Sequence, residues 1–106
     1  MERSPEGVPP AAPVVLTDRD LDAYGAATRR EIELLRQALR SGRGVRHTEL
    51  DSVGARTAGM STARFHELTR AVETALRSHL SVERGAQLDS LRIELLVLRV
   101  RVEATR

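Results

Sequence analysis

The side chains able to act as acids, bases or metal ligands are three histidines and two groups of carboxylates: His47, His66 and His79, then Asp18, Asp20 and Asp22, then Glu31 and Glu33. The histidines lack metal-ligand spacing among themselves and with nearby acids. Glu31 and Glu33 lie about 200° apart around a helix, so they cannot act as a catalytic carboxylate pair. The 106-residue chain has no cysteine and no lysine, which excludes thiolate and Schiff-base catalysis. We therefore predict that the protein is not an enzyme and uses no metal or cofactor.

Arginine supplies all 17 of the cationic side chains, and the net charge is only +2. The basic part of the chain is the stretch 36–84, in which nine arginines stand against five acids. A surface of this kind could attract an anionic partner, or it could be the ordinary solvated side of helices. The charge distribution leaves both interpretations open.

One pattern within residues 51–70 has a structural mechanism. Ala55 is followed four residues later by Gly59 and then by Ser61, and the apolar Phe65 and Leu68 come four and seven residues after the serine. This spacing resembles the helix-turn-helix of bacterial repressors. A small residue lets two helices approach, glycine adopts a positive φ, serine caps the second helix, and the apolar residues anchor it to a core.

The resemblance implies a DNA-binding protein. In that alternative the side chains that contact nucleic acid are Arg56, Thr62, Arg64, His66 and Arg70. The chain departs from the family pattern at Gly54, where the family usually has an apolar residue. A tight glycine–serine corner also joins helices that bind no DNA, so an ordinary helix connection is the competing hypothesis.

Composition and periodicity predict an all-α fold. Aromatic residues make up only 2% of a chain that is rich in alanine, leucine, glutamate and arginine, and this balance favours helices over strands. All four prolines lie within residues 1–15, where we expect a disordered N-terminal segment. Residues 16–106 should form a single helical domain, a small bundle of three long helices plus one short helix.

The first helix has clear start and stop signals. Thr17 is a good N-cap, and the three aspartates that follow place negative charge where the helix dipole favours it. Side chains of one face then recur at spacings of three and four, at Leu21, Tyr24, Thr28, Ile32, Leu35 and Leu39. Gly42 and Gly44 should end this helix.

Glycines also separate the remaining helices. We expect a short second helix over about 48–58, with Thr48 as its N-cap, Asp51 close to a capping box, and Gly59 at its end. The third helix should run from Ser61 to about residue 82. Its expected apolar face is Phe65, Leu68, Val72, Ala75 or Leu76, and His79 or Leu80. Gly85 should break the chain before a fourth helix over about 87–104.

The fourth helix is apolar on two opposite sides. At about 100° per residue, one face carries Leu88, Leu91, Leu95, Leu98 and Val102. The opposite face carries Ile93, Leu96, Val97 and Val100. Leaving these four side chains in water would forgo roughly 1.5–3 kcal/mol of burial each, so the helix should be covered on both sides.

Two alternatives bear on this helix. The same residues could form a β-strand, although the alternation changes parity and would require a bulge at 96–97. The first and third helices could also take one apolar face each, which would bury both faces within a monomer. We favour the helix, with Ile93, Leu96, Val97 and Val100 at an interface with a second chain.

The sequence therefore predicts a non-catalytic helical interaction module that self-associates, or docks into a larger assembly, through its C-terminal helix. The alternative is a helix-turn-helix DNA-binding protein that dimerises through the same helix. No stretch approaches the ~20 apolar residues that a membrane span needs, and the N-terminus has no signal-peptide pattern, so we expect a soluble cytoplasmic protein.

Overall fold

A computed structural model describes residues 16–77 and 82–104 of the chain. These residues form four α-helices: α1 (Asp18–Ser41), α2 (His47–Ala58), α3 (Thr62–Ala75) and α4 (Val82–Ala104). The predicted all-α fold is confirmed, and the segment predicted to be a helix or a bulged strand is helical throughout 82–104. The predicted disordered segment 1–15 lies outside the described residues.

Helix α1 begins and ends where its sequence signals predict. The Thr17 hydroxyl accepts a hydrogen bond from the Asp20 backbone N–H at 3.1 Å, and the Asp20 carboxylate accepts one from the Thr17 N–H at 3.0 Å. This capping box satisfies two backbone donors at the helix start. Gly42 ends the helix in the left-handed region, with φ 67°, and its N–H donates back to the last turn.

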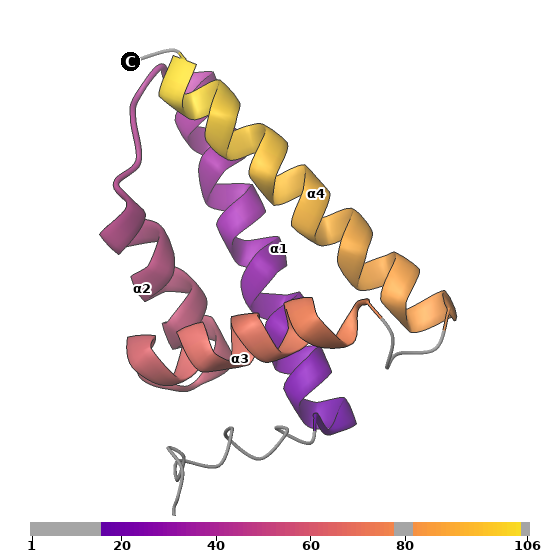
Figure 1. The fold of residues 1–106 in the computed structure, drawn as a ribbon. Helices are drawn as coiled ribbons and strands as arrows, with labels where there is room; N and C mark the ends of the chain where they lie inside the picture. Colours follow the sequence, from indigo (N-terminus) through magenta and orange to yellow (C-terminus); the bar gives the residue numbers. More distant parts are fainter. Residues whose placement is uncertain (1–15, 78–81, 105–106) are drawn as a thin grey trace, which may run out of the picture.

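Helix α1 is the central helix of the bundle. Helix α1 packs against each of the other three helices, and α2 also packs against α3. In Figure 1, α4 runs beside α1 on the side away from α2, and α3 crosses α1 near its N-terminal half. One core cluster lies where α1 meets α3 and the start of α4, around Tyr24, Phe65, Val72 and Leu88. A second cluster, around Leu35, Leu50 and Leu98, lies where α1 meets α2 and the end of α4.

The corner between α2 and α3 forms as its sequence predicts. Gly59 adopts the left-handed conformation with φ 73°, which a residue without a Cβ reaches without strain. The Ser61 hydroxyl accepts a hydrogen bond from the Arg64 backbone N–H at 3.2 Å and so caps α3. Phe65 and Leu68 are buried and anchor α3 to the core.

The predicted span of the second helix agrees with α2 to within one residue, but the predicted N-cap, Thr48, is wrong. Helix α2 begins at His47, and its N-cap residue is Arg46, which makes no side-chain cap. Thr48 therefore lies inside the helix. The start is set instead by burial of Leu50, whose N–H already bonds to the Arg46 carbonyl at 3.0 Å. Glu49 adds a negative charge in the first turn, which the helix dipole favours.

The predicted boundary between the last two helices is also wrong. Helix α3 ends at Ala75 in a tight turn, and α4 begins at Val82 and continues through Gly85. A glycine inside a helix costs about 1 kcal/mol relative to alanine. Contacts with α1 offset this cost, because Arg84 pairs with Asp22 at 2.5 Å and Leu88 is buried one turn later. The positions His79 and Leu80, predicted for the apolar face of the third helix, lie outside the described residues.

Candidate functional site

The inner face of α4 packs against α1. Leu88, Leu98 and Val102 are buried, and Leu91 and Leu95 are partly buried against the same core clusters. All five residues of the first predicted apolar face of this helix therefore belong to the core. In the described part of the chain, α4 has no other helix backbone beside it than that of α1.

The second predicted apolar face of α4 is open to solvent in the single chain. The exposed large hydrophobic side chains among the described residues are four on this face. They are 46–68% exposed: Ile93, Leu96, Val97 and Val100. We call these four residues the outer stripe. The alternative in which the first and third helices cover one face each is wrong, because α1 covers the inner face, α3 meets only the start of that same face around Leu88, and the second face stays exposed.

Charged residues border the outer stripe on both sides. At about 100° per residue, Glu94 and Arg101 lie along one side, and Arg92 and Glu103 lie along the other. All four are at least partly exposed. We call them the rim. The rim thus combines two acids with two arginines, and each side of the stripe carries one of each sign.

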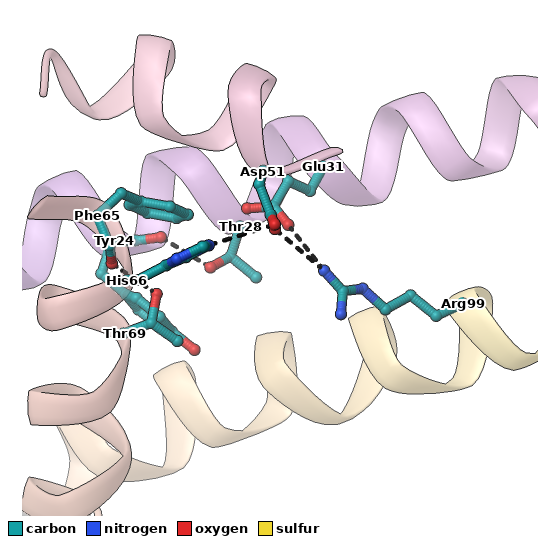
Figure 2. A network of polar contacts seen from close by, with 8 residues as sticks. All are labelled: Tyr24, Thr28, Glu31, Asp51, Phe65, His66, Thr69 and Arg99. Carbon is teal, nitrogen blue, oxygen red and sulfur yellow. Dashed lines mark hydrogen bonds and ion pairs between the residues drawn. The ribbon is translucent and has the colours of Figure 1, made fainter. Parts of the chain in front are cut away.

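A second site is a polar network that draws one side chain from every helix. The Arg99 guanidinium of α4 lies 3.8 Å from the Glu31 carboxylate of α1 and 3.7 Å from the Asp51 carboxylate of α2. The other Asp51 oxygen lies 3.2 Å from His66 Nε2 of α3. Figure 2 shows Arg99 extending from α4 toward both carboxylates, with His66 on the far side of Asp51. We call these four residues the polar network.

Glu31 is the most unusual member of the polar network. Its side chain is only 4% exposed, and its nearest cation is beyond ordinary hydrogen-bond distance. The pKa of Glu31 is raised to about 7, chiefly by burial; the Arg99 charge acts to lower this pKa, and the Asp51 charge acts to raise it. Removing the carboxylate from water therefore has a larger effect than its pairing with the arginine. The Arg99 Nε is also buried, without a hydrogen-bond partner in residues 16–77 and 82–104.

Gly54 makes room for the buried carboxylate. A Cβ at this position would lie 2.3 Å from Glu31 Oε2 and 2.8 Å from Phe65 Cε2. The close approach of α2 to α1 and α3 therefore requires glycine. This explains the departure from the helix-turn-helix pattern at Gly54, where an apolar side chain would occupy the space of the glutamate and the phenylalanine ring.

The five side chains of the DNA-binding alternative lie around the α2–α3 corner, and all are exposed: Arg56, Thr62, Arg64, His66 and Arg70. His66 is also a member of the polar network, so one of its nitrogens contacts Asp51. Two acids on α3, Glu67 and Glu73, are exposed among the same arginines. The α3 surface is consequently mixed in charge.

The polar network was not predicted from the sequence, which indicated only that Glu31 and Glu33 do not form a catalytic carboxylate pair. Successive members are 15 to 33 positions apart along the chain, beyond the reach of helical periodicity. The one local signal was Gly54 in the middle of a helix, because glycine there costs stability and so points to a close contact that leaves no room for a side chain.

In the parts of the chain that the structure describes, no group of three or more histidine and acidic side chains could hold a metal ion. None of the described helices is long and apolar enough to cross a membrane. No family model, no curated protein and no solved structure matches this chain.

Proposed function

We propose that this chain is a non-catalytic helical interaction module that self-associates through the outer stripe of α4. The observation that carries the proposal is that four branched side chains lie together on one helix face and remain about half exposed in the single chain. A scattered surface leucine needs no explanation, but a contiguous apolar stripe bordered by polar residues is typical of protein interfaces.

The charges of the rim favour a second copy over an anionic partner. Nucleic acid and acidic membrane surfaces are recognised by an excess of lysine and arginine. The rim instead carries equal numbers of acids and arginines. A surface with this balance is complementary to another surface of the same kind, which a second copy of the chain provides.

The strength of the association follows from the area that remains exposed. Burying the exposed half of each stripe side chain contributes about 1 kcal/mol, or about 4 kcal/mol per copy for all four. Association costs roughly 4–15 kcal/mol in lost freedom. Since two stripes meet in a dimer, the apolar contact contributes about 8 kcal/mol, which lies within the range of this cost. We therefore expect a dimer of weak to moderate affinity, in which contacts between the rim residues contribute to the free energy of association.

The double variant Leu96→Glu/Val100→Glu tests the proposal. It places two charges on each copy in the centre of the contact, where they lose water without gaining partners. We expect the dimer to weaken by about a hundredfold or more, since each ~1.4 kcal/mol corresponds to a factor of ten. Sedimentation velocity over a range of concentrations measures the effect.

A matched control is Gln37→Glu/Gln87→Glu, which adds the same charge at exposed positions of α1 and α4 outside the stripe. This control should associate like the unmodified chain, and circular dichroism should report the same helix content for all three proteins. If the unmodified chain sediments as a monomer at several hundred micromolar, self-association is wrong and docking into a different assembly remains.

The second candidate function is DNA binding through the α2–α3 corner. Two observations favour it. Gly59 and Ser61 adopt the conformations expected at such a corner, and α3, which ends at Ala75, has a length of 14 residues that suits a recognition helix. Against it, Glu67 and Glu73 reduce the positive charge of α3.

Fluorescence anisotropy with duplex DNA of random sequence distinguishes this candidate. A DNA-binding corner should bind at 50 mM salt and release the duplex steeply as salt rises, because arginine–phosphate contacts displace counterions. The triple variant Arg56→Ala/Arg64→Ala/Arg70→Ala should then reduce both the affinity and the salt slope. We expect no binding at 50 mM salt, and salt-sensitive binding lost in the triple variant would contradict this expectation.

A further inference from the structure

We infer that Arg99 of the polar network switches between two helices as Glu31 gains or loses a proton. When Glu31 is protonated, Arg99 pairs with Asp51 of α2, and when Glu31 is ionised, Arg99 pairs with Glu31 of α1. Each state ties α4 to a different neighbour, so the network is a conformational switch within the bundle. The switch is independent of the proposed self-association, because no member of the network belongs to the outer stripe.

The Arg99 guanidinium stands between the two acids. Its Nη2 atom lies 3.8 Å from Glu31 Oε1 and 3.7 Å from Asp51 Oδ1, so one nitrogen is almost equidistant from both carboxylates. A charge-assisted N–H···O bond is about 2.7–2.9 Å long, so neither contact is a formed hydrogen bond. A shift of about 1 Å toward either acid forms one, and the flexible stem of the arginine allows such a shift. Figure 2 shows the side chain reaching from α4 toward both acids.

Protonation of Glu31 leaves Asp51 as the charged member of this pair of acids. Coulomb attraction then acts between Arg99 and Asp51, and it no longer acts between Arg99 and the neutral Glu31. The contact reaches α2 although, in residues 16–77 and 82–104, the backbones of α2 and α4 do not lie beside each other. In this state Arg99 therefore joins α4 to α2.

Ionisation of Glu31 reverses the preference, because the two acids differ in burial. The Glu31 side chain is 4% exposed, whereas the Asp51 side chain is 26% exposed. A buried carboxylate has little water to stabilise it and attracts a nearby cation more strongly than an exposed one does. Asp51 keeps its contact with solvent and with His66, whose Nε2 lies 3.2 Å from its other oxygen. Arg99 is therefore drawn to Glu31 and joins α4 to α1.

The two states exchange near neutral pH. Burial is the largest cause that raises the pKa of Glu31 to about 7, and Arg99 from α4 and Asp51 from α2 act on this pKa in opposite directions. Beyond Asp51, His66 of α3 carries a charge only when it is protonated. Tyr24 of α1 also interacts with the Glu31 charge, but burial raises the pKa of its hydroxyl above 10.0, so the hydroxyl stays neutral. The charge of Glu31 is therefore the change that exchanges the partners of Arg99.

A double-mutant cycle tests the high-pH state, because it measures the coupling of two side chains separately from the cost of burying each. Glu31→Gln is combined with Arg99→Gln, and urea unfolding gives the four stabilities at pH 5 and pH 8.5. We expect a coupling of roughly tenfold in the unfolding constant at pH 8.5 and of less than about twofold at pH 5, where glutamine matches the protonated acid. Equal coupling at the two pH values would overturn the inference.

A second cycle, Asp51→Asn with Arg99→Gln, tests the low-pH state. It is measured in a His66→Gln background, so that titration of the histidine does not alter the surroundings of Asp51. Here we expect the opposite trend, with a coupling at least about threefold larger at pH 5 than at pH 8.5. A coupling that stays constant or grows toward pH 8.5 would show that Arg99 does not leave Asp51, and the switch would be wrong.

The control cycle is Arg30→Gln with Glu33→Gln, because this pair lies at the surface of α1 outside the polar network. Its coupling should be small and should differ by less than about twofold between the two pH values. If the control changes with pH as much as the first cycle does, the effect is a general one and the inference fails.

The unmodified chain provides a test that does not depend on the folding of any variant with two or three substitutions. The Arg99 Nε–H group is buried, and its NMR signal can be identified by its loss in Arg99→Gln. We expect this signal to shift with a midpoint near pH 7, where Glu31 titrates, and to stay in place between pH 5 and pH 8.5 in Glu31→Gln. A signal that does not move in the unmodified chain would contradict the exchange of partners.

Discussion

Replacing Gly54 with alanine should destabilise the fold by about 1–3 kcal/mol, although alanine is the better helix former. The new Cβ would lie 2.3 Å from Glu31 Oε2 and 2.8 Å from Phe65 Cε2, closer than real atoms approach. The carboxylate is the end of a flexible side chain and can move, but the phenylalanine ring is held in the core. Inserting a methyl group into a packed core typically costs 1–3 kcal/mol. Thermal unfolding should show a drop of roughly 4–8 °C for each kcal/mol lost.

Gly25→Ala is the matched control, since Gly25 is also buried within a helix. A Cβ at this position would meet Arg29 Nη1 and Leu88 Cδ2 at 3.6 Å, which is ordinary van der Waals contact. We expect this variant to gain up to about 1 kcal/mol, because alanine lowers the entropy cost of forming the helix. The two substitutions are chemically identical and should have opposite signs. Equal effects would show that α2 does not approach α1 as closely as the structure has it.

The features that could be predicted from the sequence are those encoded by neighbouring residues. The capping box at Thr17, the left-handed Gly59 and the Ser61 cap each involve residues within four positions of one another. The two apolar faces of α4 follow in the same way from helical periodicity. Such signals predict four helices, and helical periodicity alone identifies the four residues of the outer stripe.

The errors concern boundaries and contacts that depend on packing. Gly85 is a helix breaker by propensity, yet α4 continues through it because Arg84 and Leu88 contact α1 on either side. Tertiary contacts override a local preference of about 1 kcal/mol. The polar network is a stronger case. No spacing rule connects Glu31 to Arg99, because these residues meet only after α4 has packed against α1.

The polar network makes the stability of the fold depend on pH, and Glu31→Gln should remove that dependence. Burial raises the pKa of Glu31 from 4.5 to about 7, so the folded chain holds this proton more tightly than the unfolded chain does. The stabilisation from the proton is complete below about pH 4.5, and it is lost as the pH rises through about 7. Glutamine has the shape of the protonated acid and cannot ionise. We expect Glu31→Gln to be about 1–3 kcal/mol more stable than the natural chain at pH 8 and equally stable at pH 4.

The difference between the two unfolding curves isolates Glu31 from the other groups that face it. Arg99 from α4, Asp51 from α2 and, beyond it, His66 from α3 are present in both proteins, so what they contribute to stability on their own cancels to first order. Glu33→Gln is the control, because Glu33 is exposed two positions along the same helix and pairs with Arg30 at the surface. Its effect should stay below about 1 kcal/mol at every pH. If Glu31→Gln instead loses stability at pH 8, the attraction of Arg99 exceeds the cost of burying the carboxylate, and the network acts as an ion pair that joins α1 to α4. Urea unfolding of both proteins at pH 4 and pH 8 shows whether the cost of burying the Glu31 carboxylate or its attraction to Arg99 is larger.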